Sequence, residues 1–170
     1  MFYYQYNPED GKIISSAEWL PDWFEYYVES EIDYNVYNLQ NCYVEDNEIK
    51  VTLAGHAYKK NEDYNKYLTA HAYCEIATNK FINPVDDYSR YYHVFEKDEA
   101  ILKIHCLDEN KREATIEFSD KAAALAMIDD IVKYCHEFTI NKNDTFYSIA
   151  HAQTVEEIEA ITFNTPVFRG

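Results

Sequence analysis

The chain has 170 residues, of which 47% are hydrophobic and 16% aromatic, so it can bury one sizeable core and is not expected to be disordered. Its 31 acidic and 15 basic residues give a net charge of −16 at pH 7, which argues against direct binding to nucleic acid or to an anionic membrane and favours a basic protein as partner. The glycines, Gly11, Gly55 and Gly170, are too few and too far apart for a G-x-G-x-x-G motif or a phosphate-binding P-loop.

Four cysteines, Cys42, Cys74, Cys106 and Cys135, are spread along the chain without a C-x-x-C pair. Their apolar and strand-like neighbours predict buried free thiols. The first twelve residues, MFYYQYNPEDGK, lack the basic and apolar regions of a signal peptide. No apolar run reaches the roughly 18 residues that a membrane span needs. A cytoplasmic protein is therefore expected.

The first elements expected are a strand over residues 2–6 and a turn over 7–11. A helix is predicted over about 17–29, with Ser16 as its N-cap and Pro21 in its first turn. Apolar side chains would form the buried side of this helix, namely Trp19, Leu20, Trp23, Phe24 and Tyr27. Acidic residues at spacings of four, three and four would line the opposite side, namely Glu18, Asp22, Glu25 and Glu29.

Strand-like segments follow in the middle of the chain. They are residues 40–45, 48–58, 68–77, 91–96, 99–107 and 112–118. The short polar segments 45–47 and 108–111 are predicted to be hairpin turns.

The clearest helix is predicted over about 120–137, with Ser119 as its cap. Its apolar positions recur at steps of three, four and three, at Leu125, Ile128, Val132 and Cys135. A shorter helix is expected near 154–161, where Thr154 and Glu157 form a capping box. Together these elements predict an α+β fold, a single domain over residues 1–170. Its antiparallel β-sheet of about five to seven strands would be packed by the long helix and by the shorter helices near 17–29 and 154–161.

Residues 138–161, FTINKNDTFYSIAHAQTVEEIEAI, resemble the first part of a LysM module. The matching residues are Asp144-Thr145, Tyr147-Ser148-Ile149-Ala150 and Thr154 to Ile158, whereas Asn143 stands where that family usually has glycine. The resemblance would imply two helix starts in this segment and binding of N-acetylglucosamine polymers.

The tripeptide His-Ala-Tyr occurs at 56–58 and again at 71–73, and a further His-Ala pair occurs at 151–152. Along a strand, alternation would place small apolar residues on one face of each segment and Thr, His and Tyr on the other. Two strands are therefore predicted, and the repeat is interpreted as the same binary pattern used twice. If they pair with His56 opposite His71, Tyr58 meets Thr69 and Thr52 meets Glu75, which are reasonable cross-strand pairs.

The alternative is a small enzyme or metal-binding protein that uses the His56/His71 face, with Glu75 or His93 as a third ligand. No H-x-H, H-E-x-x-H or C-x-x-C spacing supports this alternative, and no serine lies in a G-x-S-x-G elbow. No catalytic residue, metal or cofactor is therefore expected.

The acidic residues of the helix predicted over 17–29 continue beyond it, with tyrosines interleaved. The predicted partner-binding residues are Glu18, Asp22, Glu25, Tyr26, Glu29, Glu31, Asp33 and Tyr34. Carboxylates at the rim of an interface speed association with a basic surface, and buried aromatic anchors slow dissociation. The chain's 17 tyrosines fit this role, because tyrosine is enriched at protein interfaces.

These features predict a non-enzymatic inhibitor or binding protein that blocks a basic partner. The expected partner is a nuclease or another nucleic-acid-binding effector, because such proteins carry a positive groove that carboxylates can occupy in place of phosphates. Two settings fit: a phage anti-defence protein, such as an anti-CRISPR or an antirestriction nucleic-acid mimic, or an immunity protein against a nuclease toxin. A secretion chaperone, also small and acidic, is a third hypothesis. The sequence does not indicate an oligomeric state.

Overall fold

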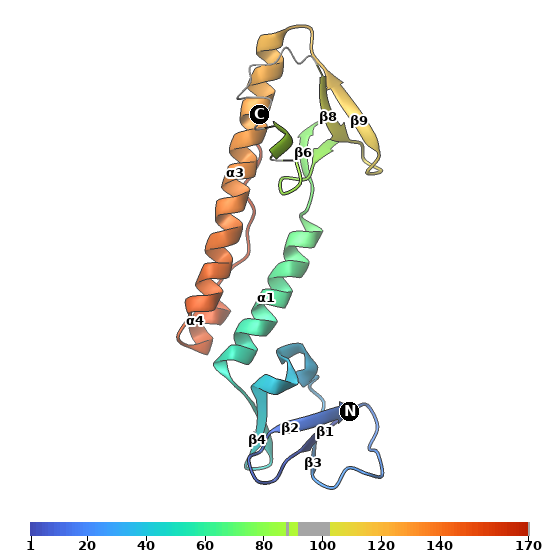
Figure 1. The fold of residues 1–170 in the computed structure, drawn as a ribbon, viewed down its shortest axis with the longest axis vertical. Helices are drawn as coiled ribbons and strands as arrows, with labels where there is room; N and C mark the ends of the chain where they lie inside the picture. The colour runs from blue at the N-terminus through green and yellow to red at the C-terminus, as the bar shows by residue number, and fades with distance from the viewer. Residues whose placement is uncertain (88, 92–102, 170) are drawn as a thin grey trace. The chain divides into compact units, whose positions relative to one another are not determined.

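The computed structural model describes residues 1–87, 89–91 and 103–169. The fold is α+β, as predicted, and its described residues form nine strands in three antiparallel sheets, more than the number expected (Figure 1). The chain divides into two compact units, Met1–Asn65 with Tyr147–Thr162 and Lys66–Phe146 with Phe163–Gly170. The expectation of a single domain stays a prediction. In the part of the chain that is described, no helix combines the length and apolar character that crossing a membrane requires.

The first unit contains a three-stranded sheet in the order β2-β1-β3. Its strands are β1 (Phe2–Tyr6), β2 (Ile13–Ala17) and β3 (Tyr27–Ser30). Tyr4 lies in the central strand and is fully buried, with Ser16 and Val28 as its neighbours in the adjoining strands. The predicted strand 2–6 is confirmed, and so is the turn that follows it, which is closed by a 2.8 Å hydrogen bond from the Gly11 N–H to the Asn7 carbonyl.

The helix predicted over 17–29 is wrong, because residues 18–26 form an irregular loop and the chain then enters β3. Pro21 has no N–H to donate, and its carbonyl instead accepts a 3.1 Å hydrogen bond from the Phe24 N–H in a tight turn. Tyr27 and Val28, residues that favour strands, then pair with β1. Sheet pairing therefore overrides the helical spacing of the acidic residues.

Two short 3-10 turns, Tyr34–Tyr37 and Leu39–Asn41, lead to the hairpin of β4 (Cys42–Glu45) and β5 (Glu48–Val51). The connecting residues Asp46 and Asn47 have φ angles of 52° and 61°. Positive φ at both positions is characteristic of a two-residue type I′ turn, which Asp and Asn tolerate well. The predicted hairpin is confirmed, although its second strand ends at Val51 rather than at residue 58.

Helix α1 (Leu53–Ala70) replaces the second half of the strand predicted over 48–58 and the first three residues of the one predicted over 68–77, whose last four residues do form a strand. Those predictions are wrong wherever they overlap the helix. The buried and half-buried positions Ala57, Asn61, Tyr64 and Leu68 recur at steps of four, three and four, which is a helical period. The two-residue alternation around each histidine extends over too few residues to compete with this longer pattern.

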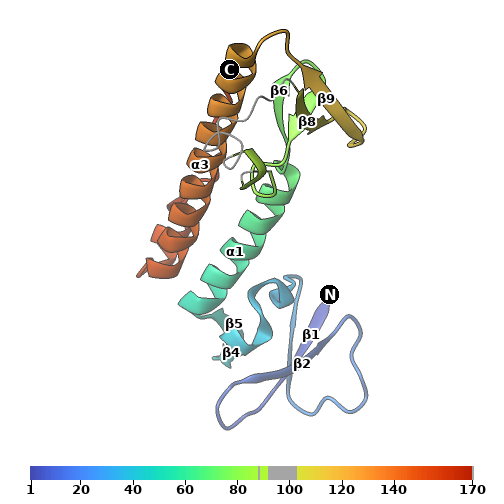
Figure 2. The ribbon, with the colours of Figure 1, turned by 45° about the horizontal axis from the view of Figure 1, so that its top comes forward.

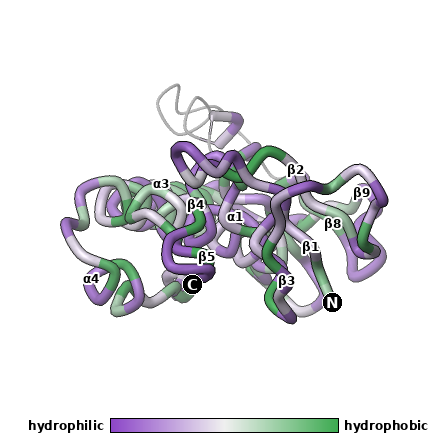
Figure 3. Tube along the Cα trace, turned by 90° about the horizontal axis from the view of Figure 1, so that it is seen from below, coloured by the Kyte–Doolittle hydropathy of each residue, from purple (hydrophilic) through white to green (hydrophobic). Residues whose placement is uncertain are grey.

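Helix α4 (Val155–Ala160) confirms the short helix expected near 154–161, and the Thr154 Oγ1 accepts a 3.1 Å hydrogen bond from the Glu157 N–H as its cap. Along α4 the chain alternates between hydrophobic and hydrophilic residues, and Ile158 is the buried one (Figure 3). Residues 138–151 continue α3 (Lys121–His151) without a break. The first helix start implied by the LysM resemblance is therefore wrong, because Asp144 and Thr145 lie inside α3.

The second unit contains a four-stranded antiparallel sheet in the order β6-β7-β8-β9. Its strands are β6 (Cys74–Ala77), β7 (Lys80–Ile82), β8 (Lys103–Leu107) and β9 (Glu113–Glu117). The predicted turn 108–111 is confirmed, with the Asp108 carboxylate accepting hydrogen bonds from the backbone of Asn110 and Arg112. Most of the strand predicted over 91–96, and the first residues of the one predicted over 99–107, lie outside the described residues.

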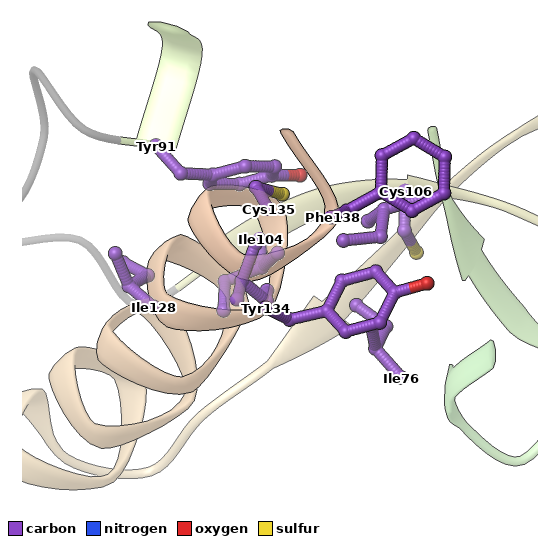
Figure 4. Packing of buried hydrophobic residues seen from close by; sticks show 10 residues of the cluster. Ile76, Tyr91, Ile104, Cys106, Ile128, Tyr134, Cys135 and Phe138 are labelled. Atoms are coloured by element: carbon purple, nitrogen blue, oxygen red, sulfur yellow. The ribbon is translucent and has the colours of Figure 1, made fainter. Parts of the chain in front are cut away.

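Figures 1 and 2 show this sheet beside the first half of α3. The contact is made by a cluster of buried side chains (Figure 4): Ile76, Ile82, Tyr91, Ile104, Cys106, Ile128, Ile131, Tyr134, Cys135 and Phe138. Ile128 and Cys135 thus lie where the helical period placed them, whereas Val132 is only partly buried against the cluster.

The ends of the long helix differ from the prediction. Its N-cap is Asp120 rather than Ser119, because the Asp120 carboxylate accepts a 2.9 Å hydrogen bond from the Ala123 N–H. It continues to His151 instead of stopping at residue 137. The segment 138–151 contains no glycine or proline that would end it.

Truncation of Ile128 tests the packing of α3 on the sheet. Because this side chain is only 1% exposed, Ile128→Ala is expected to lower the free energy of unfolding by roughly 2–5 kcal/mol. Ile140→Ala is the matched control, since Ile140 lies in the same helix but is 47% exposed. Chemical denaturation measures both, and equal small effects would contradict the assigned core.

Substitution of Gly11 tests whether the first turn lies as close to β4 as the structure shows. Its φ is +70°, and a Cβ there would lie 2.3 Å from the Val44 carbonyl oxygen, so Gly11→Ala is expected to destabilise the chain by more than about 1 kcal/mol. Asn47→Gly, at another position of positive φ, should be tolerated. The two variants are compared by their thermal unfolding midpoints. An unchanged midpoint for Gly11→Ala would contradict the close contact between Gly11 and the Val44 carbonyl.

Candidate protein-binding site

The eight residues predicted to bind a partner all belong to the first unit, within residues 18–34. They do not form a helical stripe. Four lie in the loop between β2 and β3 (Glu18, Asp22, Glu25 and Tyr26), Glu29 lies in β3, and the remaining three follow it (Glu31, Asp33 and Tyr34). The side chains of the first six are exposed, whereas those of Asp33 and Tyr34 are half-buried.

Two tryptophans in the same loop were expected to face the core but are exposed. Trp19 is 72% and Trp23 is 64% exposed, and Tyr26 beside them is 50% exposed. Phe24 is the buried anchor of the loop, and its ring meets that of Trp23 edge-on at 4.6 Å. We name residues 18–34 the acidic aromatic surface. Exposed tryptophans are costly in water and typical of protein interfaces.

The charge around this surface has one sign. Between Lys12 and Lys50 the sequence contains no Lys, Arg or His, while its acidic residues there are Glu18, Asp22, Glu25, Glu29, Glu31, Asp33, Glu45, Asp46 and Glu48. Within the described chain, none of the carboxylates of residues 18–34 takes part in a salt bridge. Their field therefore acts on solvent and on any approaching partner rather than on a neighbouring base.

Residues of the acidic aromatic surface form a groove together with Phe2 of β1 and Ser16 and Ala17 of β2. Its apolar walls include Phe2, Trp19 and Trp23, and its polar lining includes Glu18, Asp33 and Asn35. The Asp33 Oδ1 accepts hydrogen bonds from the Asn35 backbone N–H (3.0 Å) and from its side-chain amide (2.7 Å). The Asn35 amide oxygen in turn lies 3.0 Å from the Ser16 hydroxyl, which donates to it. The Asp33 carboxylate is thus held in one orientation.

The pairing of His56 with His71 across two strands is wrong, because His56 lies in α1 and His71 immediately follows that helix. His71 Nδ1 lies 2.8 Å from the Tyr67 carbonyl oxygen, and the two rings stack at 4.1 Å. His151, the last residue of α3, is placed likewise, 2.8 Å from the carbonyl oxygen of Tyr147. His71 and His151 therefore each contact a carbonyl in the last turn of a helix, whereas His56 does not share this position.

His56 has a different environment, with its ring 5.3 Å from that of Tyr37. Among residues 1–87, 89–91 and 103–169, no three His, Cys, Asp or Glu side chains are grouped so that they could hold a metal ion. His93, a third ligand in the metal hypothesis, lies outside these residues, and the strand face on which that hypothesis rested is not formed.

The cysteines lie in surroundings that disfavour a thiolate. Cys42, Cys106 and Cys135 are buried and Cys74 is partly buried, all as free thiols. Burial raises the pKa of Cys42 to about 11 and that of Cys135 to about 12, and it also raises the pKa values of Cys74 and Cys106. All four thiols are therefore protonated at neutral pH, which does not suit a nucleophile.

A second recess lies in the second unit, and the ionic groups described there are largely engaged with one another. The Asp87 carboxylate accepts a 3.0 Å hydrogen bond from the Asn83 N–H and forms a 3.3 Å ion pair with the Arg90 guanidinium. Asp86 accepts a hydrogen bond from the Asn83 side chain. These contacts hold the segment after β7 in place, and we assign them a structural role.

Replacement of both histidines tests their structural role. The double variant His56→Gln/His71→Gln is expected to change the free energy of unfolding by no more than about 1 kcal/mol, as for other surface contacts. The purified wild-type chain should contain no stoichiometric zinc when analysed by atomic emission. Zinc at one equivalent that disappears in the double variant would overturn this assignment.

Comparisons with known proteins gave no relative of this chain: no family model, no curated protein and no solved structure matches it. The role of the acidic aromatic surface is therefore inferred from its residues, their exposure and their charge.

Proposed function

We propose that the protein is a non-enzymatic binding protein whose acidic aromatic surface blocks a basic partner. The observation that carries the proposal is the exposure of Trp19, Trp23 and Tyr26 within a segment of 37 residues, 13–49, that contains no basic side chain. Aromatic side chains of this kind dominate the binding energy of interfaces when they become buried. The surrounding carboxylates restrict the partner to one that carries positive charge.

A nuclease or another nucleic-acid-binding effector is the partner class that fits this surface best. Such proteins bind phosphates through Lys and Arg, and a row of carboxylates can occupy the same groove. The net charge of −16 supports the proposal, since it exceeds the magnitude of about 2–8 that solubility alone calls for in a small domain. The corresponding settings are a phage anti-defence protein or an immunity protein against a nuclease toxin, acting in the cytoplasm.

The partner can be sought by affinity capture from host extract with the whole chain as bait, at low and at high salt. A specific partner of this kind should be basic. Less of it should be captured at high salt, because salt screens exposed charge pairs, with a Debye length of about 8–10 Å at physiological ionic strength. Purified partner should then be inhibited in nucleic acid binding or cleavage. Capture of an acidic or neutral protein, unaffected by salt, would contradict the proposal.

Charge reversal tests the role of the carboxylates in association. Glu25→Lys/Glu29→Lys is expected to slow association with the captured partner by about tenfold or more at low salt and to flatten its salt dependence. The control is Glu109→Lys/Glu137→Lys, which changes the net charge equally at exposed positions of the second unit. Stopped-flow or surface-based kinetics distinguish the two, and equal slowing by both pairs would show that only the overall charge matters.

Truncation of an aromatic residue tests the contribution of the exposed rings to the lifetime of the complex. Trp23→Ala and Tyr26→Ala are expected to leave the association rate nearly unchanged and to speed dissociation, by a factor of about 30 for a residue that contributes 2 kcal/mol. Tyr147→Ala is the control, because Tyr147 is 64% exposed but lies outside residues 18–34. Dissociation rates that do not change in either loop variant would exclude these rings from the interface.

A further inference from the structure

The groove of the acidic aromatic surface combines two features that are rarely adjacent on a protein exterior. The indole rings of Trp19 and Trp23 line it together with Phe2. Glu18 and Asp33 line the same groove, and none of the described residues that line it is basic. Aromatic faces carry partial negative charge, so both kinds of lining attract a cation.

The Asp33 carboxylate is already oriented to accept a hydrogen bond from a cationic ligand. Both hydrogen bonds from Asn35 go to its Oδ1, and among the described residues no hydrogen bond is made to its Oδ2. A carboxylate that is already oriented loses little side-chain entropy when it accepts a hydrogen bond from a ligand.

We propose that this groove receives an arginine side chain of the basic partner, with the guanidinium against the indole rings and its N–H groups donating to Glu18 and Asp33. The inference rests on the proposed function and specifies how the partner is recognised. Arginine fits better than lysine, because its planar guanidinium stacks on aromatic rings, is weakly hydrated and matches carboxylates with two parallel hydrogen bonds. An anionic ligand would be repelled by the two carboxylates. A purely apolar ligand would displace water from them without replacing its hydrogen bonds.

The protein contains its own probe for this site. Trp19 and Trp23 are its two tryptophans, so the intrinsic tryptophan fluorescence of the whole chain reports on the groove. The ligand used is a blocked Gly-Arg-Arg-Gly peptide, with the lysine and citrulline peptides of the same length for comparison. Citrulline keeps the planar shape but lacks the charge.

The arginine peptide is expected to change the fluorescence saturably, to bind at least tenfold more tightly than the citrulline peptide and several-fold more tightly than the lysine peptide. Asp33→Asn and Glu18→Gln should each weaken arginine peptide binding by about tenfold. Asn at position 33 retains an oxygen for the contacts to Asn35, so the loop should stay folded. Glu9→Gln, which removes one exposed charge outside the groove, should leave binding unchanged.

Equal binding of the citrulline peptide, or equal weakening by Glu9→Gln and Asp33→Asn, would overturn the proposal. A fluorescence change that depends on protein concentration without peptide would also overturn it, since it would mean that a second copy of the chain occupies the groove.

The outcome is separable from that of the proposed function. If Asp33→Asn binds the captured partner as tightly as wild type while Glu25→Lys/Glu29→Lys slows association, the groove inference fails and the proposed function stands. If the arginine peptide binds as expected but substitutions in residues 18–34 do not change binding of the captured partner, the proposed function fails, and the groove binds arginine without serving that partner.

Discussion

The hydroxyl of Tyr4 organises the first unit. It donates a 3.0 Å hydrogen bond to the Ile32 carbonyl and accepts a 2.8 Å hydrogen bond from the Tyr34 N–H. Its ring meets that of Tyr34 edge-on at 5.6 Å. Burial raises the pKa of Tyr4, so the hydroxyl stays neutral and can both donate and accept. The central strand of the sheet is thereby joined to the segment 32–34, which carries Asp33.

The loop with the exposed tryptophans is held by other contacts, among them a 3.1 Å hydrogen bond from the Tyr6 N–H to the Tyr26 carbonyl. Residues 18–26 are irregular, but β2 and β3 flank them on either side of β1, and Phe24 fixes them from within. The loop can therefore present Trp19 and Trp23 to solvent without relying on their burial for stability. An interface built on a rigid support loses less entropy on binding than a flexible one, which would favour the proposed binding.

The sequence predicted those elements that are set by a local signal, either a long helical period or a polar turn between two strands. The helical period of Leu125, Ile128, Val132 and Cys135 identified the start of α3, and the polar turns at 45–47 and 108–111 identified two hairpins. It failed where tertiary pairing decides the outcome. The acidic residues 18, 22, 25 and 29 have helical spacing, yet Tyr27 and Val28 pair with β1. The strand-like alternation around His56 and His71 was too short to outweigh the longer helical pattern of α1.

The candidate site was predicted in part for the same reasons. The positions of the carboxylates could be read from the sequence, because charged side chains seldom lie inside a core. The exposure of Trp19 and Trp23 could not, since aromatic residues are usually buried and the irregular loop 18–26 has no periodic pattern that would show which of its side chains face solvent. Tyr27 and Val28, which favour strands, were a local sign against a helix that reaches residue 29.

The central claim is that residues 18–34 become buried against a basic partner. Oxidative footprinting of the whole chain with and without the captured partner tests it most directly, because indole and phenol rings are oxidised according to their exposure. We expect protection of Trp19, Trp23 and Tyr26 in the complex, with no change at the exposed Tyr58 and Tyr147. Full oxidation of both tryptophans in a saturated complex, with protection elsewhere on the chain, would contradict the account.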